Sequence, residues 1–367
     1  MLIELHAIQS FGPTNLNRDD TGNPKEALFG GVRRARVSSQ SAKRAMRSSD
    51  VFRKNIQGNI GTRTKTLIAE LTKQLSDGGL PEEAAYNAAA SVVSSVFAKL
   101  DSKNANKTSV LVYISPAEFQ LLVNYISEAY QQGELPDENQ IKKELKKLLK
   151  DRSLAPDIAL FGRMLAEHPD LSVDAACQVA HALSTHEVNS AEFDYFTAVD
   201  DLTPDEEAGA GMLGLVAFNS ATYYRCIRIG WEQLVQNLHG DHVLASTTVS
   251  ALMQAFALVV PSGMKNSFVN QHAPDFLLAV VRRDNDGQSL DNAFEKPIRA
   301  KKGSGYVEPS ISALSEYWEQ VDRAFRLSEP VVSVMNPRNY ELASTELVDA
   351  QKNNLQSWVE TIISELS

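Results

Sequence analysis

Apolar and polar residues alternate from Leu2 to Gln9, and this two-residue period predicts a β-strand that ends at the turn Ser10-Phe11-Gly12-Pro13. A continuous apolar run from Thr108 to Ser115 predicts a buried strand. Two further strands are expected near residues 221–230 and 275–283. Strands are therefore expected toward both ends of the chain.

A helix is predicted from Ser38 to about Lys54, because the serine hydroxyls at its start can accept hydrogen bonds from the first backbone amides. On a helical projection, polar and basic residues share one arc about 100° wide, and apolar residues lie opposite. The helix therefore has a basic face and a packing face. The basic arc contains Gln40, Lys43, Arg44 and Arg47, and the packing arc contains Ala42, Ala45 and Met46.

Helical spacing also predicts a block of helices in the middle of the chain and three more toward its end. Residues 15–36 and 187–224 lack a sustained period and are predicted to be loops, and such long irregular segments are usually functional or disordered. The predicted class is α+β, with a helical block inserted between strand-bearing ends. The helices are predicted at residues 64–76, 81–100, 137–150, 172–183, 241–260, 311–325 and 345–366, with another starting at Pro116.

The composition, 43% hydrophobic and 22% charged over 367 residues, is that of a globular protein with one large domain or two. The chain has no apolar run of about eighteen residues and no N-terminal signal pattern, so we expect a cytoplasmic protein with no membrane partner. Cys177 and Cys226 are far apart in the sequence and are expected to be buried thiols, not part of a disulfide framework.

Charge is distributed unevenly along this chain, whose net charge is −10. Residues 31–54 contain eight Lys and Arg and one acid, whereas residues 164–224 contain eleven acids and no Lys or Arg. Phosphates respond to the field within a Debye length of about 10 Å, so the basic segment can bind a polyanion despite the net charge. Residues 17–47 also combine guanidinium groups, ammonium groups and a helix N-terminus, which phosphate recognition uses. A solvated basic helix is the alternative interpretation.

Two pairs of adjacent carboxylates occur in the chain, Asp19-Asp20 and Asp200-Asp201, and paired acids can hold divalent ions that activate water. A metal-dependent endoribonuclease is therefore the alternative function. Adjacent acids rarely both reach one site, however. His181 and His186 are five residues apart, not the four that would align two ligands on one helix face. The chain also has no Gly-rich phosphate loop followed by Lys-Ser or Lys-Thr. We therefore expect no catalytic activity, no metal and no cofactor.

Seven blocks lie in order along nearly the whole chain: NRDD (17–20), FGG (29–31), RR (33–34), SSQSAKRAMR (38–47), DIALFGRM (157–164), FTAVDD (196–201) and NAFEK (292–296). Together they resemble the CasC-type (Cas seven family) backbone subunit of the type I-E CRISPR Cascade complex. The resemblance implies an RRM-like (ferredoxin-like) palm from residues 1–60 and 221–367, a helical fingers insertion at 61–183 and a protruding thumb at 184–220. The RNP aromatic motif of sequence-reading RRMs is absent, so bases are not expected to stack on the palm sheet.

The resemblance implies a non-enzymatic surveillance-complex subunit that binds CRISPR RNA (crRNA). Copies of the chain would assemble head to tail along the guide, beside other Cascade subunits, and display its bases for pairing with target DNA in antiviral defence. Met164 resembles a wedge beside a displaced base, and Phe196 and Thr197 would lie on the thumb. The candidate RNA-binding residues are Asn17, Arg18, Lys25, Arg34, Arg36, Ser38, Gln40, Lys43, Arg44, Arg47, Arg163 and Lys265.

Overall fold

The computed structural model describes residues 1–133, 137–150, 154–165, 167–189, 191–196, 214–283, 287–300 and 303–366. The chain forms two compact units, the first from residues 1–52, 179–228 and 250–367, and the second from residues 53–178 and 229–249. These divisions differ from the expected domain boundaries after residues 60 and 183. Residues 229–249, which we expected in the palm, belong to the second unit.

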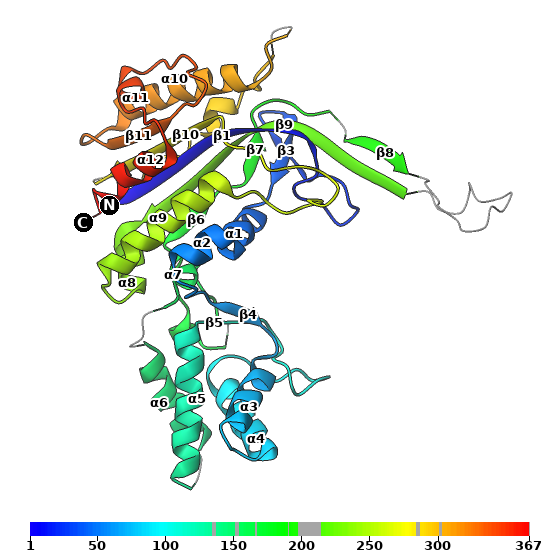
Figure 1. The fold of residues 1–367 in the computed structure, drawn as a ribbon, viewed down its shortest axis with the longest axis vertical. Helices are drawn as coiled ribbons and strands as arrows, with labels where there is room; N and C mark the ends of the chain where they lie inside the picture. The colour runs from blue at the N-terminus through cyan, green and yellow to red at the C-terminus, as the bar shows by residue number, and fades with distance from the viewer. Residues whose placement is uncertain are drawn as a thin grey trace, which may run out of the picture. The chain divides into compact units, whose positions relative to one another are not determined.

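A large antiparallel sheet dominates the first unit and confirms the α+β class (Figure 1). The strand order is β11-β10-β1-β9-β7-β3-β2, with β6 and β8 also paired to β9. The register of β1 against β10 runs from Leu2 opposite Arg282 to Ile8 opposite Phe276. The strands are β1 (Leu2–Thr14), β2 (Glu26–Phe29), β3 (Val32–Val37), β6 (Cys177–Val179), β7 (Ala182–Ser184), β8 (Glu192–Phe196), β9 (Gly214–Gly230), β10 (Phe276–Arg282) and β11 (Val331–Met335).

Successive side chains of β1 and β9 point to opposite faces of this sheet, as the pleat requires. On one face, Ile8 and Tyr224 pack in a core cluster with Trp318 of α10. On the other face, Phe11 shares a cavity wall with Ala42 of α1. The two helices therefore cover opposite faces (Figure 1). The helices that belong wholly or partly to this unit are α1 (Ser39–Ser48), α2 (Asp50–Asn55), α9 (His242–Leu258), α10 (Val307–Phe325), α11 (Thr345–Asp349) and α12 (Leu355–Ile363).

β8 and the start of β9 form a two-stranded ribbon that extends beyond the rest of the sheet (Figure 1). Its register runs from Glu192 opposite Phe218 to Phe196 opposite Gly214. Strands β2, β3 and β8 and the first part of β9 occupy segments that we predicted as loops, whereas the rest of β9 confirms the strand expected near residues 221–230. Polar and charged residues hid β2, β3 and β8, because these strands lack a clear apolar period. Residues 192–195 of β8 are exposed, β2 is mostly half-buried, and β3 buries Arg34 together with Ala35 and Val37.

The predicted helix over residues 172–183 is wrong, since the structure has β6 and β7 there. Leu183 pairs with Arg36 of β3 on one side and with Tyr224 of β9 on the other. Long-range pairing therefore overrides the local helix preference of this Ala-containing segment.

The second unit has a helical core beside a small sheet of β4 and β5. Helices α3 and α4 pack against each other, and the apolar stripe of α6, made of Ile141, Leu145 and Leu149, is fully buried in the same core. No helix in the described part of the chain has the length and apolar character of a membrane span. The elements are β4 (Thr62–Thr64), α3 (Leu67–Asp77), α4 (Glu82–Val96), β5 (Val112–Ile114), α5 (Pro116–Gln131), α6 (Glu138–Lys150), α7 (Pro156–Phe161), a short 3-10 helix (Pro169–Leu171) and α8 (Trp231–Asn237).

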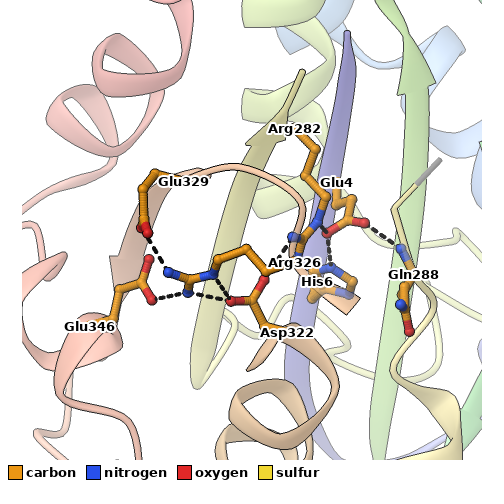
Figure 2. Close-up of polar contacts among 8 residues, drawn as sticks. All are labelled: Glu4, His6, Arg282, Gln288, Asp322, Arg326, Glu329 and Glu346. Carbon is orange, nitrogen blue, oxygen red and sulfur yellow. Dashed lines mark hydrogen bonds and ion pairs between the residues drawn. The ribbon is translucent and has the colours of Figure 1, made fainter. Parts of the chain in front are cut away.

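A buried chain of charges connects β1, β10 and α10 in the first unit (Figure 2). Arg282 donates to Glu4 at 3.3 Å and to Asp322 at 2.7 Å, and all three side chains are at most 6% exposed. Asp322 also accepts from Arg326, which bonds Glu346 of α11. His6 lies beside Glu4, with 3.6 Å between its Nε2 and a carboxylate oxygen. Every buried charge in this network therefore has an opposite partner, as buried ions require.

We expect His6 to make the stability of the first unit depend on pH. Burial lowers the pKa of His6, but Cys226 and Glu4 more than offset it and raise the pKa to about 9. A raised pKa stabilises the fold fully below the unfolded value of 6.5, and this stability is lost as the pH rises through 9. The difference corresponds to about 3 kcal/mol in the free energy of unfolding.

The measurement is urea denaturation of the wild type and of His6→Gln from pH 6 to 9.5. The wild type should lose stability across this window, and the variant should be less stable at pH 6 with a flatter profile. Parallel profiles for the two proteins would show that His6 is not the titrating group.

Candidate nucleic-acid interface

The loop that follows β1 is a folded turn that Asp19 holds together. The Asp19 carboxylate accepts hydrogen bonds from the backbone amides of Thr21 and Asn23 and from the Thr21 hydroxyl. These bonds, that of Thr21 foremost, lower the pKa of Asp19. Arg18, at the start of the turn, forms an isolated bridge with Pro24 and is exposed. The turn therefore fixes the backbone from which Arg18 extends.

The start of α1 is capped by its own serine and is tied to this loop by a hydrogen bond to Asn17. Ser38 caps the helix, and its hydroxyl accepts from the Ser41 amide at 3.2 Å, as predicted. The backbone amide of Ser38 donates to the side chain of Asn17 at 2.9 Å. The helix extends only from Ser39 to Ser48, with Met46 as its buried residue, and α2 follows after Ser49.

His181 is a residue of this region whose role the sequence did not reveal. Its Nδ1 accepts a hydrogen bond from the Ser39 amide at 2.9 Å. Burial, then the charges of Arg36 and Lys25, lower the pKa of His181. The cations thus create a positive field at the start of α1, where the amide dipoles also favour an anion. The partner amide is 142 residues away in sequence, so no local pattern could have identified it.

A polar groove of about 620 Å³ lies between the loop, α1 and the segment that carries Ser262 and Gly263. It brings together three of the predicted residues, Asn17, Arg18 and Arg44. Residues of α1 that line it are spaced i, i+3, i+4 and i+7, one face of the helix. The lining residues are Leu16, Asn17, Arg18, Asp19, Asp20, Gly22, Ser41, Arg44, Ala45, Ser48, Ser262 and Gly263.

The groove-facing stripe of α1 is rotated relative to the basic arc that we expected. Arg44 belongs to both the basic arc and the groove lining. Gln40, Lys43 and Arg47 are described in the structure and belong to the arc, but they do not line the groove. Gln40 is exposed, and Lys43 and Arg47 are half-buried. The structure therefore brings Arg18 and Arg44 to one groove and leaves these other three residues beside it.

Gly263 allows its segment to approach the end of β1. A Cβ atom at this position would lie 2.3 Å from the Leu16 carbonyl oxygen and 2.5 Å from that of Asn15, so any side chain would force the two segments apart. Lys265, two residues later, is exposed. The close approach of the two segments thus places Lys265, one of the predicted RNA-binding residues, next to the groove. Lys265 itself does not line the groove.

Lys25 and Arg36 are half-buried at the hairpin of β2 and β3. The Lys25 amide donates to the Asn17 carbonyl, and Arg36 donates from Nε to the Glu26 carbonyl at 3.2 Å. The turn of the hairpin requires Gly30, because a Cβ there would lie 1.7 Å from the Glu295 carbonyl oxygen. The Lys25 bond therefore holds the start of the hairpin against the loop that carries Arg18, and the Arg36 bond ties β3 to β2.

Arg34 and Arg163 are corrections to the expected RNA-binding set. Arg34 is fully buried and donates to the carbonyl oxygens of Ser184 and Phe294, at 3.0 and 2.7 Å. Arg163 is 6% exposed and makes a two-pronged ion pair with Glu118 at 2.8 and 2.9 Å. Both guanidinium groups are committed to internal acceptors, so neither faces a phosphate.

Met164, next to Arg163, is 84% exposed, so it is not a core residue. Phe196 ends β8, and Thr197 lies outside the described residues. The ribbon instead exposes Phe193, Tyr195 and Leu215, which we did not single out. Phe193 and Tyr195 alternate with Glu192 and Asp194, and this two-residue period is the sequence signal that could have identified β8.

No group of three or more potential metal-ligating side chains comes together in the described part of the chain. Asp19 is used by its turn, whereas Asp20 lines the groove and is exposed. Asp200 and Asp201 lie outside the described residues. His186 is buried, and His181 serves the start of α1.

Comparison with known proteins agrees with this architecture. One similar solved structure is described as "CRISPR RNA-guided surveillance complex, pre-nicking", with a TM-score of 0.86, 29% sequence identity and 100% coverage of both chains. Another, described as "CRISPR RNA-guided surveillance complex", has a TM-score of 0.76, 28% identity and the same coverage. No curated protein sequence matches the chain. The Cas_CT1975 family model, described as CT1975-like protein, matches residues 3–361, and the chain therefore belongs to this family.

Proposed function

We propose that this chain is a crRNA-binding backbone subunit of a Cascade-type surveillance complex. The similarity to subunits of RNA-guided surveillance complexes over the full length of both chains supports this proposal. The observation that carries it is the polar groove in which Arg18 and Arg44 meet. The role is binding and not catalysis: the protein holds the guide, and pairing between guide and target DNA supplies sequence specificity.

The groove acts on the RNA backbone through charge. Guanidinium groups donate in a fork that matches two phosphate oxygens, and both Arg18 and Arg44 are exposed. Arg36 and Lys25, whose charges add to the effect of burial in lowering the pKa of His181, give the start of α1 a positive field that attracts the same anion. Since phosphates are common to all sequences, such contacts hold any guide.

The finer assignments follow the family resemblance. In this proposal the complex is of type I-E, the first unit contains the RRM-like palm, and the helical part of the second unit forms the fingers. The ribbon of β8 and β9 is the base of the thumb, and its exposed Phe193, Tyr195 and Leu215 give it an apolar surface for bases or another protein. Copies of the chain assemble head to tail along the guide and present its bases to target DNA in the cytoplasm.

Replacing Arg18 or Arg44 with Ala should weaken RNA binding about equally for every guide sequence. Each lost phosphate contact should also flatten the plot of log affinity against log salt concentration by about 0.7 for single-stranded RNA. Filter binding or fluorescence anisotropy over a salt series, with two unrelated guides, measures both quantities.

Arg283→Ala is the matched control. Arg283 is in the same unit, is 58% exposed and pairs with Glu365, so its removal changes the net charge equally without touching the groove. The same loss of slope in this control would mean that net charge, and not the groove, governs binding. A loss restricted to one guide would contradict backbone recognition.

Met164→Ala should leave guide binding nearly unchanged and should alter hybridisation of the target. Because Met164 is 84% exposed, its truncation creates no core cavity, and its flexible, polarizable side chain suits the gap beside an unstacked base. Guide affinity and target annealing rate are measured on the assembled complex, with Leu148→Ala as a control at an exposed apolar residue of the same unit. Collapse of guide binding would refute the wedge assignment.

A further inference from the structure

A second polar cavity, of about 380 Å³, lies on the face of the sheet opposite to α1. Its sheet residues are Ser10 of β1 and Ser220, Ala221 and Thr222 of β9. Phe11 and Tyr223, which directly follow Ser10 and Thr222, line the packing space on the α1 side. Because successive strand residues face opposite sides, this cavity is separate from the groove that carries Arg18 and Arg44.

One wall of the cavity is a fixed aromatic pair. The rings of His186 and Tyr306 stack with centroids 3.7 Å apart and planes 13° apart. His186 is 4% exposed; its Nδ1 donates to the Glu187 carbonyl and its Nε2 accepts from the Thr222 amide. Burial lowers the pKa of His186, in agreement with this neutral tautomer. The orientation of Tyr306 is therefore set before any ligand arrives.

A second planar surface comes from Arg338 and Tyr340, which also line the cavity. The guanidinium carbon of Arg338 lies 5.1 Å from the centroid of the Tyr340 ring. Arg338 is 64% exposed, and its ion partner Asp275 is as far as 3.8 Å away. The guanidinium group therefore retains capacity to donate hydrogen bonds to a ligand.

The remaining lining offers hydrogen-bonding groups of both kinds. Thr222 and Ser10 share a hydroxyl hydrogen bond of 3.1 Å, and Ser220 donates to the Phe11 carbonyl. Glu308 adds a carboxylate that balances the charge of Arg338. A lining with one arginine, one glutamate, two tyrosines and the four hydroxyls of Ser10, Ser220, Thr222 and Ser304 favours a planar polar ring more than a bare phosphate.

We propose that this cavity binds a nucleobase, stacked against Tyr306 or Tyr340 and hydrogen-bonded by Arg338, Glu308 and the hydroxyls. Its volume lies within the range of about 300–1,000 Å³ typical of small-molecule pockets. Single-stranded nucleic acids are recognised by such stacking on aromatic rings and guanidinium planes. This inference goes beyond the proposed groove function, because the groove contacts phosphates on the other face of the sheet.

The test is equilibrium binding of AMP, GMP, CMP and UMP to the full-length protein, with ribose 5-phosphate as the probe that lacks a base. At least one nucleotide should bind at millimolar or lower concentration, and ribose 5-phosphate should bind much more weakly. Tyr306→Ala should weaken nucleotide binding about tenfold, the effect of losing one stacking contact. Phe325→Ala, at the other end of α10 and 64% exposed, should have no effect.

Arg338→Ala keeps the test decisive if Tyr306→Ala does not fold, because this exposed side chain can be removed without creating a cavity. Equal binding of ribose 5-phosphate, no nucleotide binding, or wild-type affinity in Arg338→Ala would each overturn the proposal. A single-stranded trinucleotide distinguishes a base within a strand, which should bind more tightly than the monomer, from a free nucleotide. The Arg18→Ala and Arg44→Ala variants should bind nucleotides normally, so failure of the groove hypothesis would be seen separately.

Discussion

Arg163→Ala should lower the free energy of unfolding of the second unit by about 3–5 kcal/mol, the usual cost of breaking a buried ion pair from one side. The guanidinium group bonds both oxygens of Glu118 and donates to the carbonyls of Tyr113 and Leu171. Glu118 is fully buried and cannot recover these bonds from water. The loss should appear in urea denaturation followed by circular dichroism.

The double variant Arg163→Met with Glu118→Met removes both charges of the ion pair together. Because it leaves no unpaired buried charge, it should recover part of the stability lost in either single variant. Lys99→Ala, at a 78% exposed cation of the same unit, should change stability little. If Arg163→Ala were fully stable but bound RNA less well, the original assignment to RNA would be restored.

Arg34→Ala should cost about 3 kcal/mol or more, because several charge-assisted hydrogen bonds are lost at once in a fully buried position. Its guanidinium group joins β3 to Ser184 of β7 and to Phe294 and Glu295 in the segment after β10. Arg34→Lys should recover little, since a single ammonium group does not reproduce the planar fork. Thermal and urea unfolding of the first unit measure both effects.

Arg33→Ala provides the neighbouring control. Arg33 is 67% exposed and pairs with Glu26 on the surface, an interaction worth about 0–1 kcal/mol. Arg34→Ala should therefore lower the free energy of unfolding much more than Arg33→Ala. Similar small effects for both would show that the buried bonds of Arg34 contribute little to the fold.

Elements with a clear local period could be predicted well from the sequence. The strand expected at residues 275–283 is Phe276–Arg282, and the basic helix expected at 137–150 is Glu138–Lys150. The first strand extends to Thr14, well past the predicted turn at Ser10, because Phe11 and Thr14 are buried by long-range neighbours. Turn residues mark only a local preference, which sheet pairing can override.

The candidate site was predictable as a region but not as a set of contacts. Charge counting identified the basic segment, yet it could not distinguish exposed Arg33 from buried Arg34, whose acceptors are 150 and 260 residues away. The same holds for Arg163, whose partner is 45 residues away. A helical projection gives the faces of α1 but not the face that meets the groove, which depends on how the helix packs.

The central position of β1 has a consequence during synthesis. About 200 residues separate its end at Thr14 from the start of its first sheet neighbour, β9, at Gly214. At roughly 5–20 residues per second, the apolar strand leaves the ribosome about 10–40 s before a partner exists, while the helical core of the second unit is being completed. The nascent chain therefore depends on protection of its first strand, and messages truncated before β9 should yield aggregated protein.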